Sequence, residues 1–101
     1  MKLEIEKTLV LSTEHISMDD NEKLVLLTRD CRIDDCLKVH AHDNGFRVKV
    51  DLYFSEDLEK MYAGFTAGFI KSIMFAYIND CVWVNFDSDG SSYDFLPKYE
   101  W

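Results

Sequence analysis

The sequence has few of the residues that interrupt or cross-link a chain. Its 101 residues include one proline, four glycines and three cysteines. No Ser/Gly-rich or Pro-rich stretch offers a linker, and 48% hydrophobic residues argue against a disordered chain. Because this length suffices for one core and not for two, we expect a single domain over residues 1–101.

Signals for export and for membrane insertion are also lacking. The first residues, MKLEIEKTLVLS, have no continuous apolar core with a small-residue cleavage site. The longest apolar run, residues 61–78, contains Lys71 and is shorter than the ~20 uncharged residues of a membrane helix, so a buried helix is favoured. Three cysteines, an odd number, suit a reducing compartment. We therefore expect a cytoplasmic protein with no membrane partner.

Positive charge is scarce, since 11 Lys and Arg stand against 19 Asp and Glu, a net charge of −8. This balance disfavours non-specific attraction to nucleic acid or anionic membranes, and it favours solubility or basic partners. No Gly-rich phosphate loop, nucleophile elbow or His-Glu-x-x-His motif occurs. The expectation is a protein that is not an enzyme and has no cofactor or metal.

Hydrophobic periodicity predicts two helices and two of the strands. Residues 8–12 form a short strand, and residues 17–31 form a helix capped by Ser17 with acids in its first turn. A second helix is predicted over residues 55–80, in which Gly64 and Gly68 indicate a close approach to the sheet. The last strand alternates through residues 82–87 and ends at an acidic Gly turn.

The remaining two strands are predicted as a hairpin. Asn44-Gly45 lies between two alternating segments, as a two-residue type I′ turn requires. Pairing outward from this turn matches apolar with apolar residues on one face and gathers basic residues on the other. The predicted pairs are Ala41 with Val48, Val39 with Val50, Leu37 with Leu52, His42 with Arg47, His40 with Lys49 and Lys38 with Asp51.

The predicted order is β-α-β-β-α-β. It indicates an α+β protein of two layers, an antiparallel sheet with two helices on one face, and favours the ferredoxin-like arrangement. A smaller sheet with the first strand docked elsewhere is the alternative. An outer strand edge that must be covered or paired also makes a homodimer plausible.

One sheet face of this acidic protein is predicted to be basic. A tryptophan, Trp83, points to the same side, and basic groups beside an aromatic ring suit a nucleotide or single-stranded nucleic acid. The third strand lacks the paired aromatics of an RNA-recognition module, so a solvated polar face is the alternative. The residues of this candidate site are Lys38, His40, His42, Arg47, Lys49 and Trp83.

Two other groups of residues are weaker candidates for a functional site. Cys31, Cys36, His40 and His42 are metal-ligand types, but the hairpin places lysine and arginine opposite both histidines, which opposes cation binding. His15 could act as a general base with Asp87 or Asp89 if the strand ends meet, which would make a small hydrolase. A turn or capping role is the commoner use of such residues, and no nucleophile can be assigned.

The chain ends in an acidic and aromatic segment, residues 87–101, which we expect to leave the sheet at Gly90 and dock as a strap. If the strap docks over the basic face, that face is an internal counter-charge and no ligand site exists there. If the strap docks on the helices, the basic face is free.

Both ends of the chain resemble a known family. LVLSTEHISMDDNEKL and CVWVNFDSDGSSYDFLPKYEW are similar to the opening and ending of an uncharacterised domain-of-unknown-function family of small bacterial, plasmid and phage proteins, with Glu100 where aspartate is usual. The resemblance implies a source on mobile genetic elements and a bacterial host. It groups these residues into one unit: His15, Trp83, Asp87, Asp89, Gly90, Pro97, Tyr99 and Trp101.

Small size, negative charge and this resemblance suggest a protein–protein interaction role. The leading hypothesis is a phage or plasmid protein that binds a host or phage protein and inhibits a defence system, of the anti-CRISPR or anti-restriction type. The alternatives are a nucleotide- or nucleic-acid-binding module that uses the basic face, and the small hydrolase.

Overall fold

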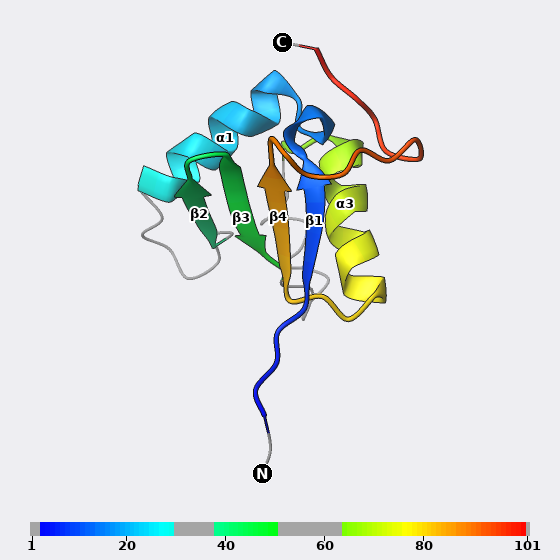
Figure 1. The fold of residues 1–101 in the computed structure, drawn as a ribbon. Coiled ribbons are helices and arrows are strands. Elements are labelled where there is room, and N and C mark those ends of the chain that lie inside the picture. Colours follow the sequence, from blue (N-terminus) through cyan, green and yellow to red (C-terminus); the bar gives the residue numbers. More distant parts are fainter. Residues whose placement is uncertain (1–2, 30–37, 51–63, 101) are drawn as a thin grey trace.

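The computed structural model describes residues 3–29, 38–50 and 64–100 (Figure 1). Its elements confirm the α+β class and follow the predicted order of strands and helices. They are β1 (Thr8–Ser12), the 3-10 helix η1 (Thr13–His15), α1 (Met18–Arg29), β2 (Val39–His42), β3 (Gly45–Lys49), α3 (Ala67–Ile78) and β4 (Trp83–Asp87).

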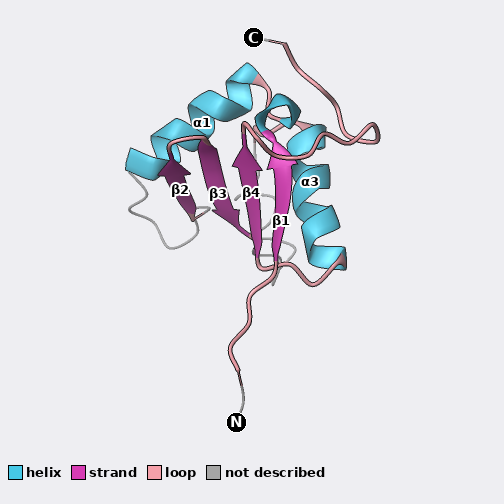
Figure 2. Cartoon of the chain, viewed as in Figure 1, coloured by secondary structure: helices cyan, strands magenta, loops and turns pink. Residues whose placement is uncertain are grey.

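The four strands form one mixed sheet in the order β1-β4-β3-β2 (Figure 2). β1 pairs with β4 in parallel, and the other two pairs are antiparallel. The chain therefore does not adopt the antiparallel, ferredoxin-like arrangement. In that arrangement the first strand lies inside the sheet, whereas β1 of this chain lies at the edge. Alternation along a strand specifies which face is buried and leaves the choice of neighbouring strand to tertiary contacts.

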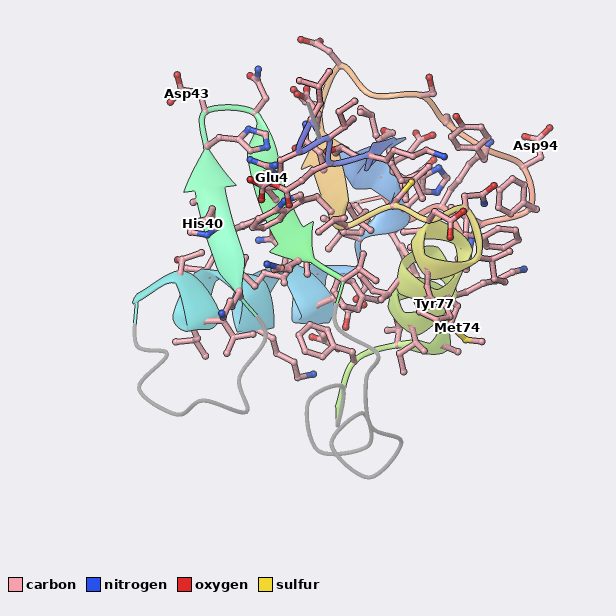
Figure 3. All side chains as sticks on the ribbon, turned by 90° about the horizontal axis from the view of Figure 1, so that it is seen from below. Glu4, His40, Asp43, Met74, Tyr77 and Asp94 are labelled. Atoms are coloured by element: carbon pink, nitrogen blue, oxygen red, sulfur yellow. The ribbon has the colours of Figure 1, made fainter. Side chains whose placement is uncertain are left out.

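Both helices cover the same face of this sheet, and Figure 3 shows the helices and strands from below. Leu11, Phe46 and Phe86 are side by side in the register of β1, β3 and β4, and all three point into the core. Phe69 of α3 stacks on Phe86 with 5.7 Å between ring centroids. Leu24, Val39, Val48, Ile73, Ala76 and Val84 complete this two-layer core.

The hairpin is confirmed, but its register differs from the predicted one by two residues. Asp43 and Asn44 form the turn, His42 pairs with Gly45, and His40 pairs with Arg47. Neither turn residue has a positive φ, so the turn is not type I′, and Gly45 itself takes φ +154°. A shift of two residues preserves the faces, so the basic residues still share one side.

The helices begin where their caps lie. Ser17 caps α1, because its Oγ accepts a hydrogen bond from the Asp20 amide at 3.1 Å. α3 begins at Ala67 with Thr66 as N-cap, after Gly64 at φ +85°. The helix predicted over residues 55–80 is therefore wrong at residues 64–66, which precede α3. Residues 55–63 of that prediction lie outside the described residues. None of the helices in the described ranges is long and apolar enough to span a membrane.

Candidate functional site

The strap, residues 87–101, docks on the helical side of the sheet as far as it is described. The Tyr99 amide donates to the Glu14 carbonyl of η1 at 2.8 Å, and Lys71 of α3 donates to the Phe95 carbonyl at 2.9 Å. Leu96 is only 4% exposed and joins the core. Trp101 lies outside the described residues. The destination of the strap is therefore η1 and α3, not the basic face.

Gly68 permits this docking. A Cβ at Gly68 would lie 2.8 Å from Pro97 Cγ and 3.3 Å from the Tyr99 hydroxyl. The close approach that this glycine predicted is real, but the partner is the strap and not the sheet.

His15 anchors the strap from within. Its side chain is fully buried, Nδ1 lies 2.8 Å from the Pro97 carbonyl oxygen, and Nε2 lies 3.0 Å from the Tyr93 amide nitrogen. Because an amide can only donate, Nε2 is the acceptor, and Nδ1 carries the proton that is donated to Pro97. Both ring nitrogens are thus engaged by backbone groups. A general-base role, which needs an available ring nitrogen, finds no support in this arrangement.

We expect His15→Ala to lower the free energy of unfolding by about 1 to 3 kcal/mol, because it empties a buried position and leaves the half-buried Tyr93 amide and the Pro97 carbonyl without their partner. Urea denaturation followed by circular dichroism measures the loss, and hydrogen exchange should show faster exchange of the Tyr93 amide. His40→Ala on the exposed β2 strand is the control. Equal stability of the two variants would refute the anchoring role of His15.

The acidic turn after β4 is held by its own backbone. Asp87 Oδ1 accepts from the Asp89 amide at 2.9 Å, and the Asp87 carbonyl accepts from the Gly90 amide at 2.8 Å. A Cβ at Gly90 would lie 2.5 Å from the Leu11 carbonyl oxygen, so β1 passes directly against the turn. These contacts match the turn interpretation of Asp87 and Asp89.

Asp94 and Lys98 form an ion pair at 3.0 Å within the strap. The hydrogen bond and charge of Lys98 lower the pKa of the Asp94 carboxyl, and Asp94 in turn raises the pKa of Lys98. Both groups are exposed to solvent, so screening leaves the pair little influence on stability.

Opposite the helices lies a second face, here called the open face. The strand register places alternate residues of all four strands on it, from Thr8 and Val10 on β1 to His40 and His42 on β2. Its middle strands contribute Arg47 and Lys49 on β3 and Trp83 and Asn85 on β4. The described part of the strap does not cover this face.

Trp83 is the centre of a cationic and aromatic cluster on the open face. The Arg47 guanidinium carbon lies 4.0 Å from the Trp83 ring centroid, and the Lys49 ammonium lies 5.6 Å from it. The His40 ring is 5.7 Å away and tilted by 56°. At the ring edge, Trp83 Nε1 donates to Glu6 Oε2 at 3.2 Å. Such cation–π contacts hold Arg47 and Lys49 over the indole.

The open face also holds a hydrogen-bonded row. His42 Nε2 lies 2.6 Å from Asn85 Oδ1, and His42 Nδ1 accepts from the Asn44 amide at 3.2 Å. Asn85 was not among the predicted site residues, although its place two residues after Trp83 on β4 puts it on the same face.

The predicted site residues fall into separate groups. His40, His42, Arg47, Lys49 and Trp83 share the open face, with Asn85 among them. His15 and Tyr99 belong to the strap anchor on the other side, and Asp87 and Asp89 form the turn between the two. The single unit implied by the resemblance is thus divided across two faces.

Cys31 and Cys36 lie outside the described residues, so the metal alternative that includes them is not tested. Within the described ranges, no three His, Cys, Asp or Glu side chains are grouped as metal ligands would be.

One protein family matches the chain. The sequence model for the C-terminal domain of DUF5983, a family of unknown function, covers residues 8–101. This match confirms the resemblance to an uncharacterised family, while the phage or plasmid source stays a prediction. Comparison with the curated proteins and with the solved structures finds no match.

Proposed function

Because the chain belongs to DUF5983, a family of unknown function, we propose its role from the geometry of the open face: binding of single-stranded nucleic acid. One observation carries the proposal. The described strap docks on η1 and α3, which leaves Trp83, Arg47 and Lys49 on the opposite side of the sheet.

The cluster around Trp83 has the chemistry that unpaired nucleotides require. Aromatic rings and guanidinium planes both stack on bases, and a base bound here would stack on the Arg47 guanidinium, which itself lies over the Trp83 ring. Lys49 and the exposed Lys38 lie next to each other, since the Lys49 amide donates to the Lys38 carbonyl at 3.0 Å. Their ammonium groups suit the phosphates that connect successive bases.

The net charge of −8 opposes nucleic-acid binding at long range, so the local distribution of charge matters. Glu6 is the carboxylate that contacts the cluster directly, through Trp83 Nε1. A phosphate entering beside the indole must displace this side chain. The proposal therefore implies modest affinity with a strong dependence on salt, and not tight general binding.

Tryptophan fluorescence tests the proposal in a Trp101→Phe background, which leaves Trp83 as the sole tryptophan. Titration with a thymidine dodecamer at low salt should quench its emission, because a base that stacks on Arg47 changes the surroundings of the indole beneath it. Arg47→Ala with Lys49→Ala should weaken binding about 10-fold or more, since base stacking and phosphate contacts are both reduced.

The matched control is Lys23→Ala with Lys98→Ala, which removes the same charge from the helical side and should leave binding nearly unchanged. Absence of quenching in the parent protein, or equal weakening by the two double variants, would rule the open face out as a nucleic-acid site.

A second proposal keeps the protein-binding role, as an inhibitor of a host defence system encoded by a phage or plasmid. It is supported by exposed apolar residues on the helical side: Met74, Tyr77 and Ile78 of α3 are 51%, 58% and 69% exposed, and Phe95 of the strap is 49% exposed. Exposed apolar residues gathered on one element are typical of protein interaction sites.

The test for this second role is a pull-down from bacterial lysate, with Met74→Glu and Tyr77→Glu as variants, together with assays of restriction and CRISPR interference. Recovery of a specific partner that both variants lose, with impaired defence, would support it. No specific partner and no effect on either defence system would exclude it.

A further inference from the structure

Asn85 has its side-chain amide oriented by neighbours on the open face. The Asn44 amide donates to His42 Nδ1, so this ring nitrogen is an acceptor and the proton of the neutral ring is on Nε2. His42 Nε2 therefore donates to Asn85 Oδ1 across a distance of 2.6 Å. The two hydrogen bonds, from Asn44 to His42 and from His42 to Asn85, have the same direction. They determine which side of the Asn85 side-chain amide is Oδ1 and which is Nδ2.

The His42 side chain reaches Asn85 across the Gly45 position of β3. His42 lies on β2 and Asn85 lies on β4, with β3 between them. The residue of β3 that pairs with His42 is Gly45, which has no side chain to stand between the imidazole and β4.

The Nδ2 group of the Asn85 side chain remains available to a ligand. With Oδ1 occupied as an acceptor, the two protons of Asn85 Nδ2 are left for other partners, and no acceptor for them is found among the described residues. Asn85 thus offers hydrogen-bond donors on the open face. A ligand that meets it must bring an acceptor.

We propose that Asn85 is a base-reading residue of the open face, which donates from Nδ2 to a carbonyl oxygen on the base that stacks on the Arg47 guanidinium over Trp83. This inference rests on the proposed binding of single-stranded nucleic acid. Trp83 and Asn85 are two residues apart on one strand face, a separation of about 7 Å, which is comparable to the width of a base. Thymine and uracil carry carbonyl acceptors on their edges, so these bases fit the site.

His42 is a positioning residue in this scheme. It need not touch the ligand, because its role is to hold Asn85 Oδ1 and keep the donors of Nδ2 turned outward. Without His42, the amide can rotate and present Oδ1, which would repel a base carbonyl. The effect of removing His42 should therefore be smaller than that of removing Asn85, and of the same kind.

The experiment compares a thymidine dodecamer with an abasic dodecamer of the same phosphate number, titrated against the Trp101→Phe protein and its Asn85→Ala and His42→Ala variants. Asn85→Ala should weaken binding of the thymidine strand about 5-fold, as expected for one lost hydrogen bond. His42→Ala should weaken it about 2-fold. Neither variant should change binding of the abasic strand or the slope of affinity against salt.

The results separate this inference from the proposal on which it rests. If the parent protein binds the thymidine strand and Asn85→Ala binds it equally well, base reading by Asn85 is wrong while the open-face site stands. Equal losses for both strands with a shallower salt slope would make Asn85 a phosphate contact and also overturn the inference. If the parent protein binds neither strand, the site itself fails.

Discussion

Replacing Gly45 by alanine is expected to lower the free energy of unfolding by about 3 to 5 kcal/mol, from overpacking together with backbone strain. A Cβ at this residue would lie 1.9 Å from the Phe86 carbonyl oxygen and 2.9 Å from its carbon. Phe86 is in the interior strand β4, paired on both sides, so its backbone cannot move aside cheaply. The φ of +154° adds strain for any side chain.

Gly64→Ala is the comparison for this prediction. Gly64 also has a positive φ, but its added Cβ would meet only the end of the Lys23 side chain, at 3.2 Å. The expected loss is about 1 to 2 kcal/mol, from the left-handed backbone alone. Urea denaturation followed by circular dichroism measures both variants. A Gly45→Ala protein no less stable than Gly64→Ala would show that β3 does not approach β4 as described.

Replacing Asp20 by alanine is expected to cost about 2 to 4 kcal/mol of stability. Asp20 is fully buried in the first turn of α1, where Oδ1 accepts from the Thr66 amide at 3.0 Å and Oδ2 accepts from the Thr66 hydroxyl at 2.5 Å. Thr66 is the N-cap of α3, and its Oγ1 accepts from the Phe69 amide. The Asp20 carboxyl therefore joins the starts of α1 and α3, and alanine would leave the half-buried amide and hydroxyl donors of Thr66 unpaired.

Asp19→Ala is the matched control, because Asp19 is the exposed neighbour of Asp20 in the same first turn. It removes the same charge and the same interaction with the helix dipole, worth about 0.3 to 1 kcal/mol. The difference between the two variants in thermal or urea denaturation isolates the link to Thr66. If Asp19→Ala were as destabilising as Asp20→Ala, the charge of the first turn would be the cause, and not the contact with α3.

Local signals in the sequence were sufficient for most elements. Ser17 predicted the start of α1, because a cap acts on amides three residues away. Strand alternation predicted that Trp83, Arg47 and Lys49 share a face. Asp20 was interpreted only as an acid in a helix first turn, since its partner Thr66 is 46 residues away. No periodicity encodes a contact at that separation.

The hairpin shows the same limit at shorter range. Asn44-Gly45 predicted a turn one residue away from the observed one, because Gly45 is the first residue of β3, where it packs closely against β4. The turn moved to Asp43 and Asn44, and each cross-strand pair moved by two residues. The basic face survived this shift because a two-residue slip preserves the side of every residue.

The sequence by itself determined the α+β class, the cap of α1, the existence of the hairpin and the gathering of cationic residues with Trp83, because each depends on periodicity or on neighbours in the chain. The tertiary structure decided the strand order, the hydrogen bonds of both His15 ring nitrogens, the docking of the strap beside Gly68 and the orientation of the Asn85 side-chain amide. These depend on which distant segments meet in space. The destination of the strap, on η1 and α3, is the contact that leaves the open face available for a ligand.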